Sequence, residues 1–407
     1  MKKDYDLIVI GSGGAGMMGA IVASRNSKSV LVLEKLPKIG AKLKATGGGR
    51  CNLTNTLESE SFMSSFGREG RFMTQALRAL DYKGLIDFFY KIGVETHSPD
   101  GQRVFPITHN SSTIILALQK EMQKLGIEIL TSSKVEKLIV QNSQIVGVET
   151  DSTIYNAPNV IVATGGLGYP QLGAEGDGYK LASDVGHKIK TPFPAMIPLK
   201  TKEDWGKNCR ADTIAKVELK IALPKYKKLR AKGDLIFTSS GIRGPVVLDF
   251  AREITPILEK HGEVPILMNL TKGMNEDEIR NIIKNSNVPI IENIKKILPY
   301  SIAKELCLIV GVAELEKFKN IAGVKRDKLI KILAWTPLTI IGHDGFKMAM
   351  ITRGGVSLKE INPNSMESKL IKGLFFCGEV MDLDGPCGGY NLQWSFSSGF
   401  LAGINVI

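Results

Sequence analysis

The sequence predicts an α/β fold, α+β overall, in which an insertion made of a small β-barrel and a helical subdomain interrupts one domain. Up to residue 190, strand-like and helix-like stretches alternate. The prolines of residues 191–194 then interrupt this alternation of strands and helices. Apolar and polar residues alternate after them, as in strands, and a helical period begins at Asn275. We therefore expect domain segments at 1–190, 191–270 (β-rich), 271–335 (helical) and 336–407, the first and last forming one discontinuous domain.

A glycine-rich turn opens the first domain. Residues 7–10 are an apolar strand, residues 30–33 are a second, and a helix-like stretch lies between them. The turn contains Gly11, Ser12, Gly13, Gly14, Ala15 and Gly16, and Glu34 ends the second strand. Such a unit binds a pyrophosphate on backbone N–H groups and a ribose hydroxyl on the acid. It predicts a Rossmann-like dinucleotide site; a tight turn without ligand is the alternative.

The remaining elements follow from periodicity and capping signals. Asn275 and Glu278 have the spacing of a capping box, and Ile279, Ile282 and Ile283 follow on one helical face. We expect helices at 71–91, 111–125, 301–310 and 325–335 and a last helix near Asn391. Strands are expected at 135–140, 145–149, 160–163, 217–223 and 234–237.

Three further segments suit a flavin better than a nicotinamide. A flavin enzyme buries a ribitol chain and a three-ring system, and it uses distant segments to do so. Residues 42–52, 160–166 and 374–391 are rich in small residues at strand or helix boundaries. The sequence therefore predicts FAD. A second dinucleotide fingerprint is absent at 165–168 and 173–176, so NADH or NADPH is expected only as a transient reductant.

Two long motifs and one short motif carry a family resemblance. They are GGGRCNLTN at 47–55, the run from Gly378 to Trp394, and Phe237-Thr238 with Gly241 and Gly244-Pro245. The chain resembles the bacterial FAD-dependent oxidoreductases that include aminoacetone oxidase-like and dehydro-bile-acid-reductase-like proteins, over essentially all 407 residues. Two residues depart from that pattern: Cys387, where the family has a small residue, and Ser239, where it often has histidine.

The residues and the resemblance together give a cofactor-binding set. The turn would hold the pyrophosphate and Glu34 the adenosine ribose, with Lys35 beside it. The resemblance implies that Lys42 and Thr46 contact phosphate or ribitol, and that Val135 contacts the adenine. It also implies contacts to the flavin or ribitol from Gly47, Arg50, Cys51, Asn52, Thr164, Gly165, Gly378, Glu379 and Asp384. Asn391, Leu392 and Gln393 would present helix N-terminal N–H groups to the flavin N1–C2=O edge.

The catalytic residues are less evident. Cys51, Asn52 and Tyr390 are the candidates, since the resemblance places them near the flavin. The five histidines have no metal-like spacing, so no metal site is expected. Cys387 beside a flavin would suit a covalent or charge-transfer species, although a packing role is the alternative.

Composition restricts the compartment and the partners. The five cysteines include no CxxC pair, which favours a cytoplasmic protein without disulfides. Residues 7–24 lack charge, yet their glycines fit the nucleotide turn better than a membrane segment. The net charge of +12 includes a basic run at Lys225, Lys227, Lys228, Arg230 and Lys232. We interpret this run as a solvated hairpin, with RNA or an acidic partner as the alternative.

The leading prediction is an FAD-dependent oxidoreductase that transfers a hydride through flavin N5 to or from a small organic substrate. Amine oxidation and NAD(P)H-dependent reduction of a C=C bond both fit. A flavoprotein acting in RNA modification is the first alternative, and a non-catalytic redox sensor using Cys51 or Cys387 is the second. We expect a small-molecule partner and neither membrane nor nucleic acid, and the sequence leaves the oligomeric state open.

Overall fold

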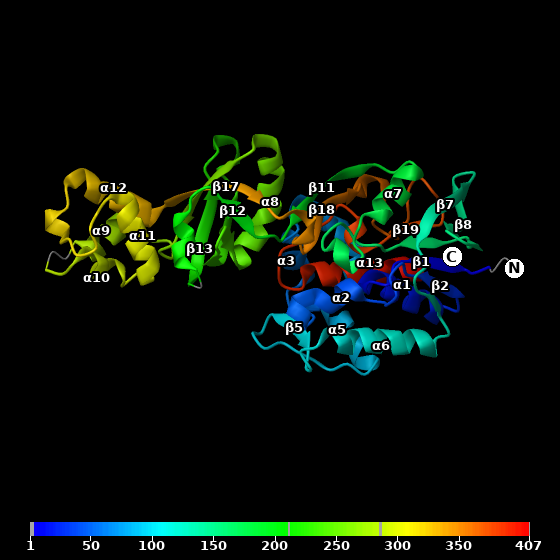
Figure 1. Cartoon of the computed structure of the whole chain (residues 1–407). Helices are drawn as coiled ribbons and strands as arrows, with labels where there is room; N and C mark the ends of the chain where they lie inside the picture. Colours follow the sequence, from blue (N-terminus) through cyan, green and yellow to red (C-terminus); the bar gives the residue numbers. More distant parts are fainter. Residues whose placement is uncertain (1–3, 211, 285–286, 407) are drawn as a thin grey trace. The chain divides into compact units, whose positions relative to one another are not determined.

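The chain divides into two compact units in a computed structural model that describes residues 4–210, 212–284 and 287–406 (Figure 1). The first unit comprises Met1–Phe193 and Met350–Ile407, and the second comprises Pro194–Ala349. Each unit has its own hydrophobic core. The predicted α/β domain with a barrel and helical insertion is therefore confirmed. No helix among the described residues combines the length and the hydropathy that crossing a membrane requires.

A five-stranded parallel sheet forms the centre of the first unit. Its order is β19 (Leu374–Phe376), β10 (Val160–Val162), β1 (Leu7–Ile10), β2 (Val30–Leu33) and β6 (Glu128–Leu130). Every residue of the first four of these strands is buried, as expected for a sheet covered on both faces. The strand order changes direction at β1, whose neighbours β2 and β10 lie on opposite sides. In open parallel sheets ligands bind at such a switch point.

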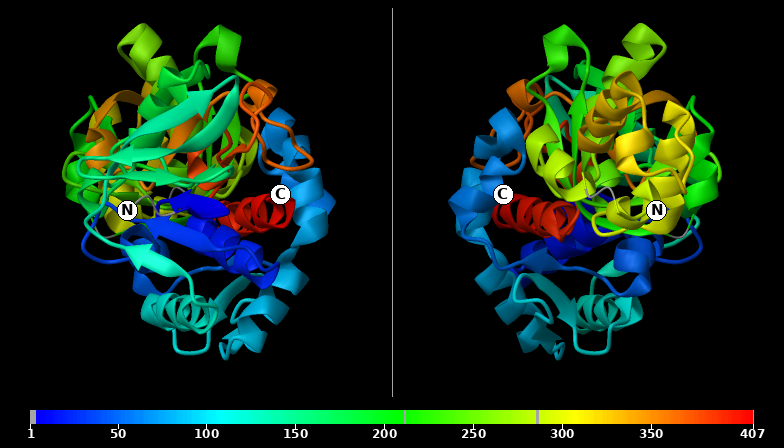
Figure 2. Two further views of the ribbon diagram at one scale, coloured as in Figure 1. Left: turned by 90° about the vertical axis from the view of Figure 1, so that its right-hand side faces the viewer. Right: turned by 90° about the vertical axis from the view of Figure 1, so that its left-hand side faces the viewer.

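Two helices pack on each other unusually closely in this unit. These are α1 (Gly14–Arg25) and α13 (Tyr390–Asn405), whose red ribbon lies beside the blue N-terminal segment in Figure 2. A Cβ at Gly399 would lie 2.2 Å from Ala15 O, and one at Gly403 would lie 2.6 Å from Gly19 O. Only glycine permits this approach. Because both contacts advance together along the two helices, the helices run parallel and their N-termini face the same side.

The other elements of the first unit surround this core. The sheet of β7 (Val135–Gln141), β8 (Gln144–Thr150) and β9 (Ile154–Asn156) is antiparallel, as is that of β3 (Thr54–Asn55), β5 (Arg103–Pro106) and β4 (Thr96–His97). Strand β11 (Ile189–Ala195) neighbours β18 (Ile351–Val356). The helices are α2 (Ala41–Ala45), α3 (Ser59–Ser64), α4 (Thr74–Ala79), α5 (Tyr82–Lys91), α6 (Ser111–Lys124) and α7 (Asp177–Asp184). The short 3-10 turns are η1 (Thr46–Gly49), η2 (Gly67–Met73), η3 (Pro170–Leu172), η8 (Leu358–Glu360) and η9 (Gly378–Val380).

The helix predicted at 71–91 is not continuous. It is divided into the end of η2, α4 and α5, because Asp81 caps a new helix. The Asp81 carboxylate accepts a hydrogen bond from Gly84 N at 2.8 Å, and Leu80 before it is non-helical. The N-cap signal at Asp81 therefore outweighs the continuous helical period.

A closed six-stranded barrel and a set of helices form the second unit. The barrel order is β12 (Leu199–Thr201), β15 (Gly241–Arg243), β14 (Arg230–Phe237), β13 (Thr213–Ile221), β16 (Val264–Asn269) and β17 (Thr336–His343). The helices are α8 (Pro245–His261), α9 (Glu276–Ile283), α10 (Ile290–Ile294), α11 (Tyr300–Val310) and α12 (Gly323–Ala334), with the 3-10 turns η4 (Trp205–Cys209), η5 (Pro224–Tyr226), η6 (Phe318–Asn320) and η7 (Gly345–Lys347). The capping box of Asn275 and Glu278 is present at the start of α9.

The boundaries of the insertion differ from those predicted. The return to the first domain was expected at residue 336, but β17 pairs with β16 and β12 and closes the barrel. The first unit therefore resumes at Met350. The barrel and the helices, expected as separate pieces, share one core that includes Val217 and Ile302. Long-range strand pairing decides this boundary, and no local composition change marks it.

Candidate functional site

A pocket lies at the carboxyl ends of the parallel strands in the first unit. The residues that follow or end β1, β2, β10 and β19 all line it: Ile10, Leu33, Ala163 and Cys377. The pocket holds about 1280 Å³ of space, part of it open to solvent. Its place at the switch point suits a dinucleotide.

The glycines of the turn have two roles: some allow close packing of the backbone, and one leaves open space in the pocket. Gly11 has φ +97°, and a Cβ there would lie 2.7 Å from Ala163 O. A Cβ at Gly16 would lie 2.0 Å from Gly11 O, so Gly16 allows α1 to approach the turn and does not itself line the pocket. Gly13 is different, because a Cβ there meets nothing within 4 Å. The pocket therefore has open space at the N-terminus of α1, where backbone N–H groups favour a phosphate.

Glu34 fixes the turn from the end of β2. Its Oε2 accepts from Ser12 N at 2.9 Å and from Ser12 Oγ at 2.5 Å, and its Oε1 accepts from Leu36 N at 2.9 Å. The Glu34 carbonyl accepts from Ser133 N, which brings Val135 to the same part of the pocket. Because a carboxylate oxygen has two lone pairs, Oε1 keeps one for a ribose hydroxyl.

Lys35 lies in the pocket wall in an ion-pair cluster. Its Nζ lies 2.6 Å from Glu175 Oε2 and 2.5 Å from Asp177 Oδ2. Burial by itself would lower the pKa of Lys35, but the hydrogen bonds and charges of Asp177 and Glu175 outweigh it and raise this pKa. The Lys35 side chain is only 15% exposed, and its ion pairs link the end of β2 to Glu175, before α7, and to Asp177, the first residue of α7.

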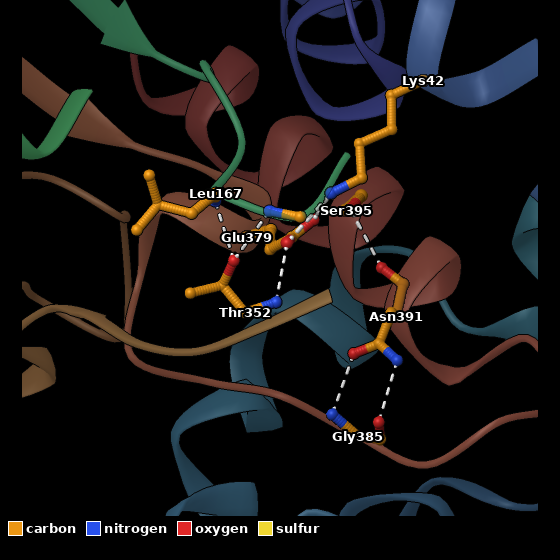
Figure 3. A network of polar contacts seen from close by, with 8 residues as sticks. Lys42, Leu167, Thr352, Glu379, Gly385, Asn391 and Ser395 are labelled. Atoms are coloured by element: carbon orange, nitrogen blue, oxygen red, sulfur yellow. Dashed lines mark hydrogen bonds and ion pairs between the residues drawn. The ribbon is translucent and has the colours of Figure 1, made fainter. Parts of the chain in front are cut away.

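A second polar network crosses the pocket near the N-terminus of α13 (Figure 3). Lys42 Nζ donates to Glu379 Oε2 at 2.7 Å and to Oε1 at 3.0 Å. Glu379 Oε1 also accepts from Thr352 N at 2.9 Å, and Thr352 Oγ1 accepts from Leu167 N at 2.7 Å. A Cβ at Gly166 would lie 2.5 Å from Thr352 Oγ1, so glycine is needed there. The network joins α2, β18, η9 and the loop after β10.

The two long motifs of the sequence meet at the start of α13. Asn55 Nδ2 donates to Gly388 O at 3.0 Å. The Asn52 amide is satisfied when its oxygen accepts from Gly389 N at 3.1 Å and its nitrogen donates to Thr54 O at 3.0 Å. Gly389 has φ +88°, and a Cβ there would lie 2.5 Å from Thr54 O. Both motifs therefore shape the N-terminus of α13.

Several predicted residues lie outside the pocket lining. Tyr390 packs its ring against Phe62 at 4.9 Å, and Arg50 is exposed with its guanidinium 5.5 Å from the Phe105 ring. Cys51 is fully buried, and this burial raises the pKa of its thiol to about 12. Gly47, Asn52 and Asp384 are also outside the lining. Cys51, Asn52 and Tyr390 have packing or hydrogen-bonding contacts here, and their catalytic roles stay predictions.

Of the three residues at the start of α13 that were predicted to face the flavin, two line the pocket. Asn391 and Leu392 line it, and the Asn391 side chain bonds to Gly385 N and O at 2.8 and 2.9 Å. Gln393 does not line it. The Gln393 N–H donates to Gly389 O, and its side-chain Nε2 donates to Leu80 O at 3.0 Å and Ser397 Oγ at 2.8 Å. The buried Gln393 side chain therefore holds α13 against the end of α4.

The remaining lining residues fit an extended dinucleotide. Thr46, Val135, Gly165 and Gly378, which were predicted to contact the cofactor, line the pocket, and a Cβ at Gly165 meets nothing within 4 Å. Thr164 also lines it, and its buried Oγ1 has no hydrogen-bond partner among the described residues. Sequence reasoning missed 20 of the 36 lining residues, among them Ser133, Lys134, Leu172, Gly173, Ala174, Asp177, Met350 and Ile351. Gly173, Ala174 and Asp177 belong to the glycine-rich and acidic run of residues 173–178, which was weighed only as a second dinucleotide fingerprint. Ser133, Lys134, Met350 and Ile351 belong to no such motif, so no local signal identifies them.

Comparisons with known proteins agree with this geometry. Residues 5–405 match the family described as HI0933-like protein Rossmann domain. The chain is 30% identical to the 3-dehydro-bile acid delta(4,6)-reductase of Clostridium scindens, over 97% of each chain. It is also 30% identical to a ribosomal RNA dihydrouridine synthase of Haemophilus influenzae, over 100% of this chain and 99% of the relative. The fold resembles the 3-ketosteroid-delta4-(5alpha)-dehydrogenase of Rhodococcus jostii, with a TM-score of 0.54, 15% identity and coverage of 99% and 97%.

Proposed function

Because the chain belongs to the HI0933-like Rossmann family of FAD-binding oxidoreductases, we propose that it reduces a C=C bond conjugated to a carbonyl group. Membership of this family confirms the resemblance inferred from the motifs at 47–55 and 378–394. The proposed reductant is NADH or NADPH. The hydride and one proton add across the C=C bond, while the nicotinamide is oxidised to NAD⁺ or NADP⁺.

The observation that supports C=C reduction is that two relatives, each matched over nearly its whole length, have names that describe reduction of a conjugated double bond. A delta(4,6)-reductase of a 3-dehydro bile acid acts on double bonds conjugated to a ketone. A dihydrouridine synthase saturates the uracil C5=C6 bond, which is conjugated to the C4 carbonyl. Both names describe one bond type on different scaffolds. This shared chemistry favours C=C reduction over amine oxidation for the present chain.

The roles proposed for the pocket residues follow from their positions. When bound, FAD supplies the hydride carrier, its N5. The N-terminus of α1 would hold the pyrophosphate, and Glu34 would accept from the adenosine ribose. Lys42 and Glu379 would bind the ribitol region, and the first N–H groups of α13 would stabilise negative charge that develops on the flavin ring.

An anaerobic absorbance experiment tests this proposal. The FAD-loaded protein is mixed with NADH or NADPH, and loss of the oxidised flavin band is followed. A steroid 4-en-3-one is then added. We expect the flavin band to return and the steroid to gain two hydrogens by mass spectrometry. If aminoacetone reduces the flavin and no conjugated ketone reoxidises it, the proposal is contradicted and amine oxidation is favoured.

A second candidate is reduction of uracil in RNA, which the name of the Haemophilus influenzae relative favours. Both candidates reduce a conjugated C=C bond, so the reoxidation experiment above can compare the two substrates directly. An unmodified ribosomal RNA transcript replaces the steroid in a parallel reaction. Reoxidation by the transcript alone, with dihydrouridine detected by mass spectrometry, would assign the RNA substrate.

A further inference from the structure

Residues 169–177, called the strap, follow β10, end at the first residue of α7, and form part of the pocket wall. The strap contributes Leu172, Gly173, Ala174 and Asp177 to the lining. Local hydrogen bonds from Leu172 N to Tyr169 O and from Gly173 N to Pro170 O shape it. Tyr169, Gly173 and Gly176 have φ of +58°, +91° and +84°. The strap is thus a sequence of tight turns beside the site.

Two lysines tie the strap to the segments that flank Glu34 and Val135. Lys35 Nζ lies 2.6 Å from Glu175 and 2.5 Å from Asp177, while Lys134 Nζ lies 3.7 Å from Asp177 Oδ1. Lys35, Lys134 and Asp177 all line the pocket. A Cβ at Gly173 would lie 2.8 Å from Leu36 Cδ1, so the strap also packs directly on the segment after Glu34. These contacts surround the part of the pocket where Glu34 would bind ribose.

We infer that the strap is an electrostatic clasp over the adenosine part of bound FAD, closed by Lys35 and Lys134 on Glu175 and Asp177. For the dinucleotide to leave this part of the pocket, the strap has to separate from Lys35 and Leu36. The side chains of Asp177 and Glu175 are 22% and 58% exposed, so salt reaches and screens these ion pairs. The inference rests on the FAD assignment and is independent of the substrate proposed above.

The test measures the rate at which FAD dissociates, through the rise of flavin fluorescence after dilution. For the wild-type protein we expect dissociation to accelerate when salt is raised from about 0.05 M to about 0.5 M. In Glu175→Gln and Asp177→Asn, dissociation at low salt should be about threefold to tenfold faster. Its dependence on salt should also be weaker, which a merely structural effect would not produce. Lys35→Arg keeps the charge and should retain the wild-type behaviour.

Asp184→Asn is the matched control. Asp184 pairs with Lys180 at 2.7 Å at the other end of α7 and does not line the pocket. Because Asp177 also lies in the first turn of α7, Glu175→Gln supplies a variant outside the helix. Wild-type rates and salt dependence in both strap variants would overturn the clasp. A wild-type protein that binds no FAD would instead overturn the cofactor assignment.

Discussion

Lys42 and Glu379 are 337 residues apart in the chain, yet Lys42 Nζ donates to both carboxylate oxygens of Glu379, at 3.0 and 2.7 Å. The second unit is inserted in the chain between these residues. Glu379 also accepts from Thr352 N, on the strand β18 that follows the insertion. One carboxylate therefore connects the two parts of the discontinuous first unit inside the candidate cofactor pocket.

Replacing Glu379 with alanine should destabilise the protein. The change leaves the Lys42 ammonium and the Thr352 N–H without their acceptor in a half-buried site. We expect the free energy of unfolding to fall by about 1–3 kcal/mol, measured by urea denaturation with circular dichroism. Glu58→Ala removes an exposed ion pair to Lys83 and is the control, with no measurable loss expected. Equal stability of the two variants would contradict a stabilising role for Glu379.

Gly13→Val should abolish FAD retention without unfolding the protein. A Cβ at Gly13 enters open space in the pocket, and its φ of −76° is available to any residue. The added side chain would therefore occupy the position of the pyrophosphate. The measurement is the flavin absorbance of purified protein, beside its thermal unfolding curve. Gly323→Ala, at the start of α12, is the control because Gly323 also has an ordinary φ and a Cβ there would meet only the Arg326 Nη2, at 3.8 Å. A Gly13→Val protein that purifies yellow would contradict the cofactor assignment.

The cysteines should differ sharply in reactivity. Cys51, Cys209, Cys307 and Cys377 are buried, and burial raises the pKa of each thiol, to about 12 for Cys51. Cys387 is half-buried. A thiol reagent at pH 8 should therefore modify Cys387 in the native protein and all five cysteines after denaturation, with Cys387→Ser as the control. Rapid modification of Cys51 in the native protein would revive the redox-sensor alternative.

Asp382 should make the stability depend on pH. Its burial, together with the negative charge of Asp384, raises the pKa of the Asp382 carboxyl from 3.8 to about 6. The folded state thus holds this proton more tightly than the unfolded state, and stability falls as pH rises from about 4 to about 6. Asp382→Asn removes this effect. Because water screens the partly exposed carboxyl, we expect a gain of about 1 kcal/mol over wild type at pH 7.

Urea denaturation of both proteins between pH 4 and pH 7 measures this difference. The two stability curves should coincide at the acid end and separate as pH rises. Curves that stay parallel across the range would show that the Asp382 proton is held equally in the folded and unfolded states.

The sequence alone was sufficient where local rules agree. The strands around Gly11, the turn itself and Glu34 follow from a period and a spacing, and the capping box of Asn275 and Glu278 fixes the start of α9. The break at Asp81 was missed although an N-cap residue was present. The N-cap residue favours a new helix there, whereas the continuous apolar period favours one long helix. The sequence alone does not show which of these two preferences is stronger.

The sequence by itself therefore determined the α/β class, the dinucleotide turn and 16 of the 36 residues that line the pocket. The tertiary structure decided which neighbours each side chain meets. Tyr390, Gln393 and Cys51 belong to motifs predicted to contact the flavin, yet they pack into the core. Asp177 lies in the run GAEGDG at residues 173–178, for which no cofactor contact was predicted, and it lines the pocket. Sequence spacing fixes the local backbone, whereas contacts such as Lys42–Glu379 depend on how distant segments pack, which no short pattern encodes.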